Sequence, residues 1–116
     1  MREFDSGAIR DTDEGKLSYV KGLSPIVLRR YLEYLDSHRT QANGEKRTFD
    51  NWKNGIAQEV YLDSLIRHSV DFWLLVDGFD AHDNHGPCNL ENLLCAIIFN
   101  SSGALHEILR SNKDGK

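Results

Sequence analysis

The helical spacing of apolar residues, repeated in three segments with breakers between them, most constrains how this chain folds. The first segment has one stripe at positions i, i+3, i+4 and i+7, formed by Leu28, Tyr31, Leu32 and Leu35. Ser24 is a favoured N-cap residue and Pro25 suits the first helical turn, while Asn43-Gly44 interrupts any helix that reaches it. The spacing therefore predicts a helix over residues 24–39.

The second segment, residues 57–77, predicts a helix that is apolar on two sides. At about 100° per residue, one sector gathers Leu62, Leu65, Ile66, Phe72, Trp73 and Val76. Val70 and Leu74 lie on the far side of the same helix. A helix with two apolar faces buries both, so we expect this one to pack on its own domain and on a second surface, such as another subunit.

The third segment predicts a helix over residues 89–111, with Asn89 as its N-cap. Its core stripe is formed by Leu90, Leu94, Ile97, Leu105 and Ile108. Small side chains at positions 100–103 interrupt the stripe and permit close approach of another helix or a ligand. Residues 1–22 show no sustained helical period and predict an extended arm. No strand pattern is evident, so the expected fold is an all-α, compact bundle of about three main helices.

Length and charge exclude several classes of function. The 116 residues suit a single helical domain, 1–116. Lys and Arg total 14 against 18 Asp and Glu, and the net charge of −4 argues against coating a nucleic-acid polymer. No apolar run has the length of a membrane span, and the first residues are polar and acidic, unlike a signal peptide. Cys88 and Cys95 fit no zinc or redox spacing, which favours reduced thiols in the cytoplasm.

The polar stripe of the 57–77 helix is the first candidate site. His68 and Asp71 stand at i and i+3, and Arg67 and Asp71 at i and i+4, so each pair can meet on the helix surface. An imidazole and a carboxylate at that spacing can share a divalent ion or position a water. Arg67 beside them can bind a phosphate. The alternative is a solvated helix face with an Arg–Asp ion pair.

Other polar residues give weaker indications. Glu91 and Asn100 stand about 180° apart on one helix, so they cannot both face one site from the same subunit. Glu91 suits the helix dipole near the N-terminus. Asn100 sits in an apolar run and needs partners for its amide, either a ligand or a neighbouring helix. The 77–89 loop holds metal-compatible residues but no known metal motif, and predicts a solvated loop. We expect His38 and His106 at the surface or at helix ends.

The connection at residues 40–56 is unusually long for a compact helical domain. It is polar and turn-rich, yet it carries two aromatic residues, Phe49 and Trp52. Connections of this length that lack secondary structure are often functional.

Several segments together resemble a phage-associated family, described as the N-terminal domain of dATP/dGTP diphosphohydrolases. These are GAIRDTDEGKLSY, LSPIVLRRYLEYL, DNWKNGI, YLDSLIRHSVDFWLL and LCAIIFNSSGALHE, in that order. The resemblance covers roughly Gly7 to Leu109. Its most specific parts are Arg10-Asp11 to Lys16 with Tyr19, Asn51-Trp52 with Gly55-Ile56, and Arg67-His68. The helical pattern is also similar, more distantly, to the all-α (MazG-like) nucleoside triphosphate pyrophosphohydrolases.

The resemblance implies hydrolysis of a purine deoxynucleoside triphosphate to the monophosphate and pyrophosphate, aided by a divalent cation, Mg or Mn. It implies that His68 and Asp71 hold metal or water, with Glu91 a further metal ligand. Phosphates would contact Arg67, Arg10 and Lys16. The base would meet Trp52 or Tyr19 by stacking, with Asn51 and Asn100 as further substrate contacts. A phage-encoded chain of this kind acts in the host cytoplasm.

One departure keeps other functions open. The ExxE and ExxD carboxylate sets of the all-α pyrophosphohydrolases are absent, and one or two carboxylates hold magnesium poorly. The alternatives are a non-catalytic module that binds or sequesters a nucleotide-like small molecule, and a structural or adaptor protein. One small domain also offers few ligands per subunit, so we expect a homo-oligomer, with no nucleic-acid polymer and no membrane as partner.

Overall fold

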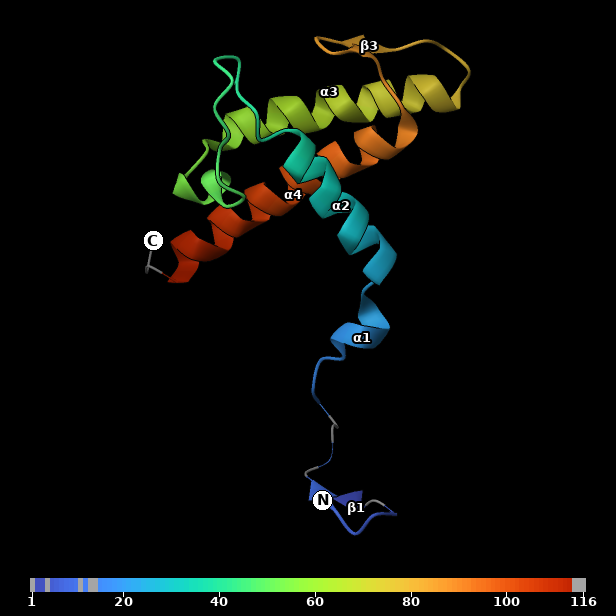
Figure 1. Cartoon of the computed structure of the whole chain (residues 1–116), viewed down its shortest axis with the longest axis vertical. Helices are drawn as coiled ribbons and strands as arrows, with labels where there is room; N and C mark the ends of the chain where they lie inside the picture. Colours follow the sequence, from blue (N-terminus) through green and yellow to red (C-terminus); the bar gives the residue numbers. More distant parts are fainter. Residues whose placement is uncertain (1, 4, 11, 13–14, 114–116) are drawn as a thin grey trace.

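The computed structural model describes residues 2–3, 5–10, 12 and 15–113, and its described part is all-α in architecture (Figure 1). The main elements are α2 (Pro25–Ser37), α3 (Gln58–Val76) and α4 (Leu90–Lys113). Figure 1 shows α3 and α4 running antiparallel and α2 crossing them. Each helix begins and ends within two residues of the range that the sequence predicts. The predicted fold class, three main helices with an extended arm, is confirmed.

Side-chain caps explain two of the three helix starts. The Ser24 hydroxyl accepts a hydrogen bond from the backbone N–H of Val27 (3.4 Å), one turn into α2. The Asn89 side chain accepts in the same way from the N–H of Asn92 (2.8 Å) at the start of α4. Each bond satisfies a backbone donor that the helix itself leaves unpaired. Ala57 precedes α3 and has no side chain able to do this.

The closest helix packing occurs where Tyr61 of α3 meets Gly103 of α4. Tyr61 is 1% exposed, and a Cβ atom at position 103 would lie 2.5 Å from the end of its ring. The Phe99 ring packs beside Tyr61 with its centroid 6.1 Å away. Small residues at 100–103 therefore admit a neighbouring helix, as the sequence predicts.

Nearer the N-terminus of α4, α2 is held by a polar contact. Arg30 donates from Nε to Glu91 (2.7 Å) and from Nη2 to the side-chain oxygen of Asn92 (2.8 Å). The Cys95 sulfur lies 4.0 Å from Nη1 of the same guanidinium. One arginine thus fixes the crossing point of α2 on the first turns of α4. Cys88 and Cys95 are free thiols.

The N-terminal arm projects away from the helices (Figure 1). It contains a two-stranded antiparallel ribbon, β1 (Arg2–Glu3) with β2 (Ile9–Arg10), and one helical turn, α1 (Tyr19–Gly22). A similar ribbon, β3 (His82–Asp83) with β4 (Gly86–Pro87), joins α3 to α4. Strands of two residues are too short to leave an alternating sequence pattern, which is why none was expected. The arm raises the Cα radius of gyration to 19.2 Å, against about 13 Å for a compact chain of this length.

Among the described helices, α4 combines unusual length with an apolar composition. Its Leu90–Asn112 segment is long and apolar enough to cross a membrane by length and composition, with a mean hydropathy of 1.2. No such segment was expected from the sequence. Only 28% of its apolar window is buried within the chain, and the cytoplasmic location stays a prediction.

Candidate functional site

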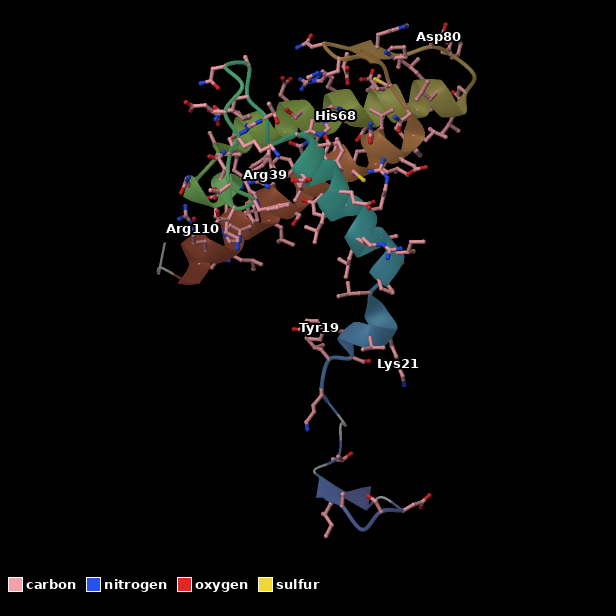
Figure 2. The ribbon with its side chains drawn as sticks, in the orientation of Figure 1. Tyr19, Lys21, Arg39, His68, Asp80 and Arg110 are labelled. Carbon is pink, nitrogen blue, oxygen red and sulfur yellow. The ribbon has the colours of Figure 1, made fainter. Side chains whose placement is uncertain are left out.

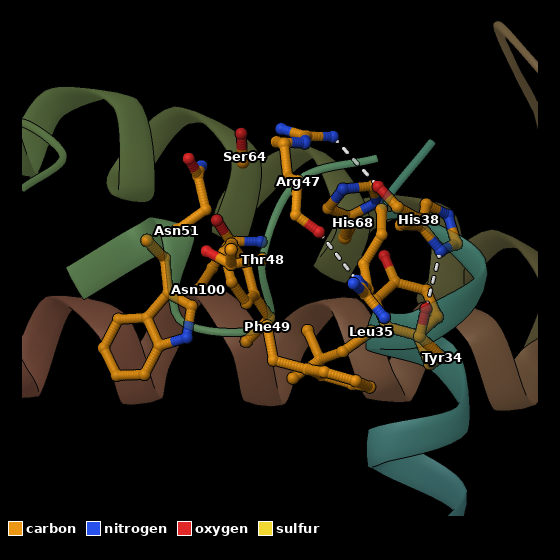
Figure 3. Close-up of a pocket in the computed structure, with 13 residues that line it drawn as sticks. Tyr34, Leu35, His38, Arg47, Thr48, Phe49, Asn51, Ser64, His68 and Asn100 are labelled. Carbon is orange, nitrogen blue, oxygen red and sulfur yellow. Dashed lines mark hydrogen bonds between the residues drawn. The ribbon is translucent and has the colours of Figure 1, made fainter. Parts of the chain in front are cut away.

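A cavity of about 240 Å³ lies between α2, α3, α4 and the connecting segment 38–57 (Figure 3). Its lining combines basic, aromatic and amide side chains: Tyr34, Leu35, His38, Arg39, Arg47, Thr48, Phe49, Asn51, Trp52, Ser64, His68, Phe99 and Asn100. No Asp or Glu stands among the lining residues that the structure describes. In a chain with a net charge of −4, this cavity is a local basic site.

The connecting segment reaches the cavity because it folds back on itself. Thr40 and Lys46 form an antiparallel bridge around a turn at Gly44, whose φ of +86° suits glycine. Arg47 then donates its backbone N–H to the carbonyl oxygen of Arg39 (2.8 Å). A short 3-10 helix, η1 (Asn51–Asn54), follows and carries Trp52. The long connection is thus an ordered wall of the cavity.

Two arginines supply most of the positive charge. Arg39 donates from Nε to the carbonyl oxygen of Arg47 (2.7 Å) and pairs with Asp36 (3.1 Å). Arg47 donates from Nη2 to the carbonyl oxygen of His38 (2.9 Å). Across the described residues Arg47 pairs with no carboxylate, so its charge is free for an anionic ligand. A guanidinium with open N–H donors suits phosphate in particular.

Aromatic and amide groups surround the arginines. The Arg39 guanidinium lies 4.5 Å from the centre of the Phe49 ring. Trp52 is half-buried and meets the His106 ring edge to face at 4.9 Å. Asn100 is 5% exposed and donates from its side chain to the carbonyl oxygen of Ala96 (2.8 Å), within its own helix. Asn100 therefore lines the cavity. One expectation was that its side chain would hydrogen-bond to a neighbouring helix, but it bonds within α4 instead.

His68 lies where the cavity meets a second one of about 150 Å³, which His38, Asp83, His85 and Cys88 also line. The Nδ1 atom of His68 is buried and has no hydrogen-bond partner among the described residues. Burial lowers the pKa of His68, and the charge of Arg67 lowers it further, while Asp71 and Asp83 oppose the shift. His68 is therefore a neutral imidazole at pH 7, able to accept a proton or a hydrogen bond.

The remaining residues of the predicted polar stripe lie outside both cavities. Arg67 contacts Asp63 (3.3 Å) and the hydroxyl of Ser64 (3.2 Å), one turn back along α3 rather than one turn forward to Asp71. Asp71 is half-buried and lines neither cavity. Its charge still acts on the site, because it opposes the lowering of the His68 pKa and helps to raise the pKa of Cys88.

The predicted metal set of His68, Asp71 and Glu91 is not brought together within one chain. Glu91 is held by Arg30 and is 73% exposed. Throughout the described part of the chain, no group of three or more His, Cys, Asp or Glu side chains is arranged to hold a metal ion. The residues present do not fit a divalent cation in a single chain.

The arm residues are also separate from the cavity. Figure 2 shows Tyr19 and Lys21 on the arm, well away from His68 and Arg39. Tyr19 is 69% exposed and Lys16 is exposed. The backbone of Arg10 belongs to β2, while its side chain and Asp11 lie outside what the structure describes. Of the predicted substrate contacts, the cavity therefore gathers Asn51, Trp52 and Asn100.

Sequence reasoning missed His38, Arg39 and Arg47. His38 was expected only at a surface or helix end, and it does cap the C-terminus of α2. The crossing of α2 over α4 and the fold of the connection bring it to the cavity, where its ring lies 4.1 Å from that of Tyr34. Two aromatic residues in an otherwise polar connection were the one signal that this segment covers a site.

No family model, curated protein or solved structure matches this chain. The resemblance to dATP/dGTP diphosphohydrolases therefore stays a prediction.

Proposed function

We propose that this protein binds a purine deoxynucleoside triphosphate in the cavity between α2, α3, α4 and segment 38–57. The observation that supports the proposal most is the lining: two arginines and two histidines, no carboxylate among the described residues, and aromatic and amide groups beside them. Phosphates bind guanidinium groups, a purine stacks on aromatic rings, and its edge hydrogen-bonds to amides.

The size of the site agrees with a ligand of this class. The two cavities share Tyr34, His38 and His68, and their combined volume of about 390 Å³ lies within the range of small-molecule sites, roughly 300–1,000 Å³. The second cavity adds one carboxylate, that of Asp83, to the lining. In the proposed pose, Arg47 and Arg39 contact the phosphates. Trp52 stacks on or flanks the base, while Asn51 and Asn100 contact its edge.

Hydrolysis to the deoxynucleoside monophosphate and pyrophosphate is the proposed reaction, and the neutral His68 supports it. A water oxygen forms the new bond to phosphorus, while the bond from that phosphorus to the bridging oxygen breaks and pyrophosphate leaves. His68 accepts the proton of the water, and Arg47 offsets charge on the phosphate oxygens. Since the described residues of one chain do not form a cation site, we derive no step through a metal.

Two candidates compete with the hydrolase. A sequestering module binds the nucleotide in the same cavity and returns it intact. The small number of carboxylates favours this reading, since the first cavity has none among its described lining residues and the second has only Asp83. An adaptor protein binds no nucleotide at all. Measurements of binding and of products separate the three.

The test is calorimetric titration of the full chain with dGTP and dATP, followed by chromatography of the mixture. We expect binding that Arg47→Gln weakens by roughly 10- to 100-fold, because a charge-assisted hydrogen bond contributes about 1.5–3 kcal/mol. Arg29→Gln, at an exposed position of α2 outside the cavity, is the matched control and should bind as the wild type does. Circular dichroism of both variants checks that each is folded.

The outcomes separate cleanly. No binding of any deoxynucleoside triphosphate, or equal affinity of wild type and Arg47→Gln, overturns the proposed site. Binding with no monophosphate formed in Mg, Mn or Co overturns hydrolysis and leaves the sequestering module.

A further inference from the structure

His38 stands where the two cavities meet, and it lines both of them. Arg39 follows it in the chain, and Arg47 donates from Nη2 to the carbonyl oxygen of His38 (2.9 Å; Figure 3). A phosphate that contacts these two guanidinium groups therefore lies in the cavity that His38 borders. We propose that His38 also binds this phosphate, and that its ring takes up a proton from the solvent when the ligand binds. This inference rests on the proposed function.

The hydrogen bonds of the His38 ring fix which nitrogen carries the hydrogen of the neutral imidazole. Nδ1 lies 2.9 Å from the carbonyl oxygen of Tyr34, and a carbonyl oxygen only accepts. The Ser37 hydroxyl is also 2.9 Å from Nδ1, but it donates its own hydrogen to the same carbonyl (2.8 Å), so it too accepts from the ring. Nδ1 therefore carries the hydrogen, and the neutral ring leaves Nε2 as an acceptor for whatever enters the cavity.

An unprotonated Nε2 suits a phosphate poorly. Phosphate oxygens are acceptors, so they bind N–H groups and are repelled by the lone pair of a neutral Nε2. Protonation turns Nε2 into a donor and gives the ring a positive charge, and a charge-assisted hydrogen bond is roughly twice as strong as a neutral one. The proton comes from the solvent, and no covalent bond of the ligand changes. Bound phosphate and protonated His38 therefore stabilise each other.

The charged groups around the ring decide when His38 becomes protonated. Titratable groups come from α2 and its end, the connecting segment, α3 and the α3–α4 loop: Tyr34, Asp36, Arg39, Arg47, His68, Asp83, His85 and Cys88. The lining residues that the structure describes on α4 are uncharged. The two guanidinium groups oppose a further positive charge, whereas Asp83 favours one. A ligand with several negative charges offsets the guanidinium groups, so protonation becomes favourable once the ligand is bound.

The other two imidazoles of the cavities are less well placed to gain the proton. Nδ1 of His68 is buried, and burial lowers the pKa of that ring, which keeps it neutral. The His85 ring lies edge to face with that of His38, at 6.0 Å, and lines only the second cavity. His38 is exposed and borders the arginine cavity, so it gains charge without losing its hydration.

The experiment is calorimetric titration of the full chain with dGTP at pH 8, 7.5 and 7, each in two buffers with different enthalpies of ionisation. The dependence of the measured heat on the buffer gives the number of protons taken up. His38→Gln keeps a side-chain N–H donor but does not titrate, and the comparison cancels any proton that dGTP itself gains or releases. We expect the affinity of wild type relative to His38→Gln to rise by about three- to tenfold for each unit that the pH falls, since uptake of one full proton gives tenfold.

The matched control is His82→Gln, because His82 is exposed in β3 and lines neither cavity. This variant should take up protons as wild type does. Binding of dGTP with the same pH dependence in wild type and His38→Gln overturns the inference and leaves the proposed site intact. Proton uptake that is lost in His85→Gln but kept in His38→Gln also overturns it. No binding of dGTP at any pH overturns the proposed function and this inference together.

Discussion

At Gly103 the helices α3 and α4 approach so closely that even a methyl group has no space. The ring of Tyr61 occupies that position and is almost fully buried. Alanine improves helix propensity by about 1 kcal/mol over glycine, but overpacking a core costs about 1–3 kcal/mol. We therefore expect Gly103→Ala to lower the free energy of unfolding by up to about 2 kcal/mol, measured by urea denaturation at one protein concentration.

The control for this prediction is Ser102→Ala, at the exposed neighbouring position of α4. Alanine meets no packed ring there, and its helix propensity should leave stability unchanged or slightly higher. If Gly103→Ala is as stable as Ser102→Ala, the close contact with Tyr61 does not limit the packing.

His68 gives the protein a defined pH dependence. Burial holds the pKa of His68 in the folded chain below the ordinary value of 6.5, which applies in the unfolded chain. At a pH between these two pKa values, the unfolded chain therefore binds more protons than the folded chain. Stability from this group is fully present above about pH 6.5 and is lost as the pH falls toward the lowered pKa. We expect wild type to lose more stability than His68→Gln between pH 7.5 and pH 5 in urea denaturation. Equal losses in the two proteins would contradict this account of His68.

Among the elements, the helix starts differ in how well they are capped. Asn89 bonds the first turn of α4, whereas Ala57 makes no capping bond to α3. Asn89→Ala should therefore lower the free energy of unfolding by about 0.5–2 kcal/mol, and Ala57→Ser should raise it by a similar or smaller amount. Chemical denaturation measures both, and a stabilising Asn89→Ala or a destabilising Ala57→Ser would be the contrary result.

The helices were predictable because their signals are local. Ser24, Pro25 and Asn89 mark starts within one turn, and the apolar spacing marks the helical period. The expected core stripe of α4 was wrong, because Leu94 and Leu105 are exposed. Burial on α4 falls instead on Leu93, Cys95 and Ala96. The cavity was only partly predictable, because its lining depends on contacts between elements distant in sequence. Asn51, Trp52, His68 and Asn100 were identified, whereas His38 and the two arginines of the connection reach the cavity only through the crossing of α2 and a turn at Gly44. No periodicity in the sequence indicates which of these distant elements lie close together in space.

At the scale of the whole molecule, an acidic chain encloses a basic cavity. Large apolar side chains are exposed on α1, α2, α3 and α4 alike, among them Val20, Ile26 and Trp73. The arm holds Tyr19 far from the cavity of its own chain (Figure 2).

The most direct test of nucleotide binding in this cavity is a two-dimensional ¹H–¹⁵N NMR titration of the full chain with dGTP. We expect the largest shifts at the Arg47 Nε–H, the Trp52 indole N–H and the side-chain amides of Asn51 and Asn100, all saturating with one affinity. Absence of shifts, or shifts confined to the arm between residues 15 and 22, would contradict the proposed site.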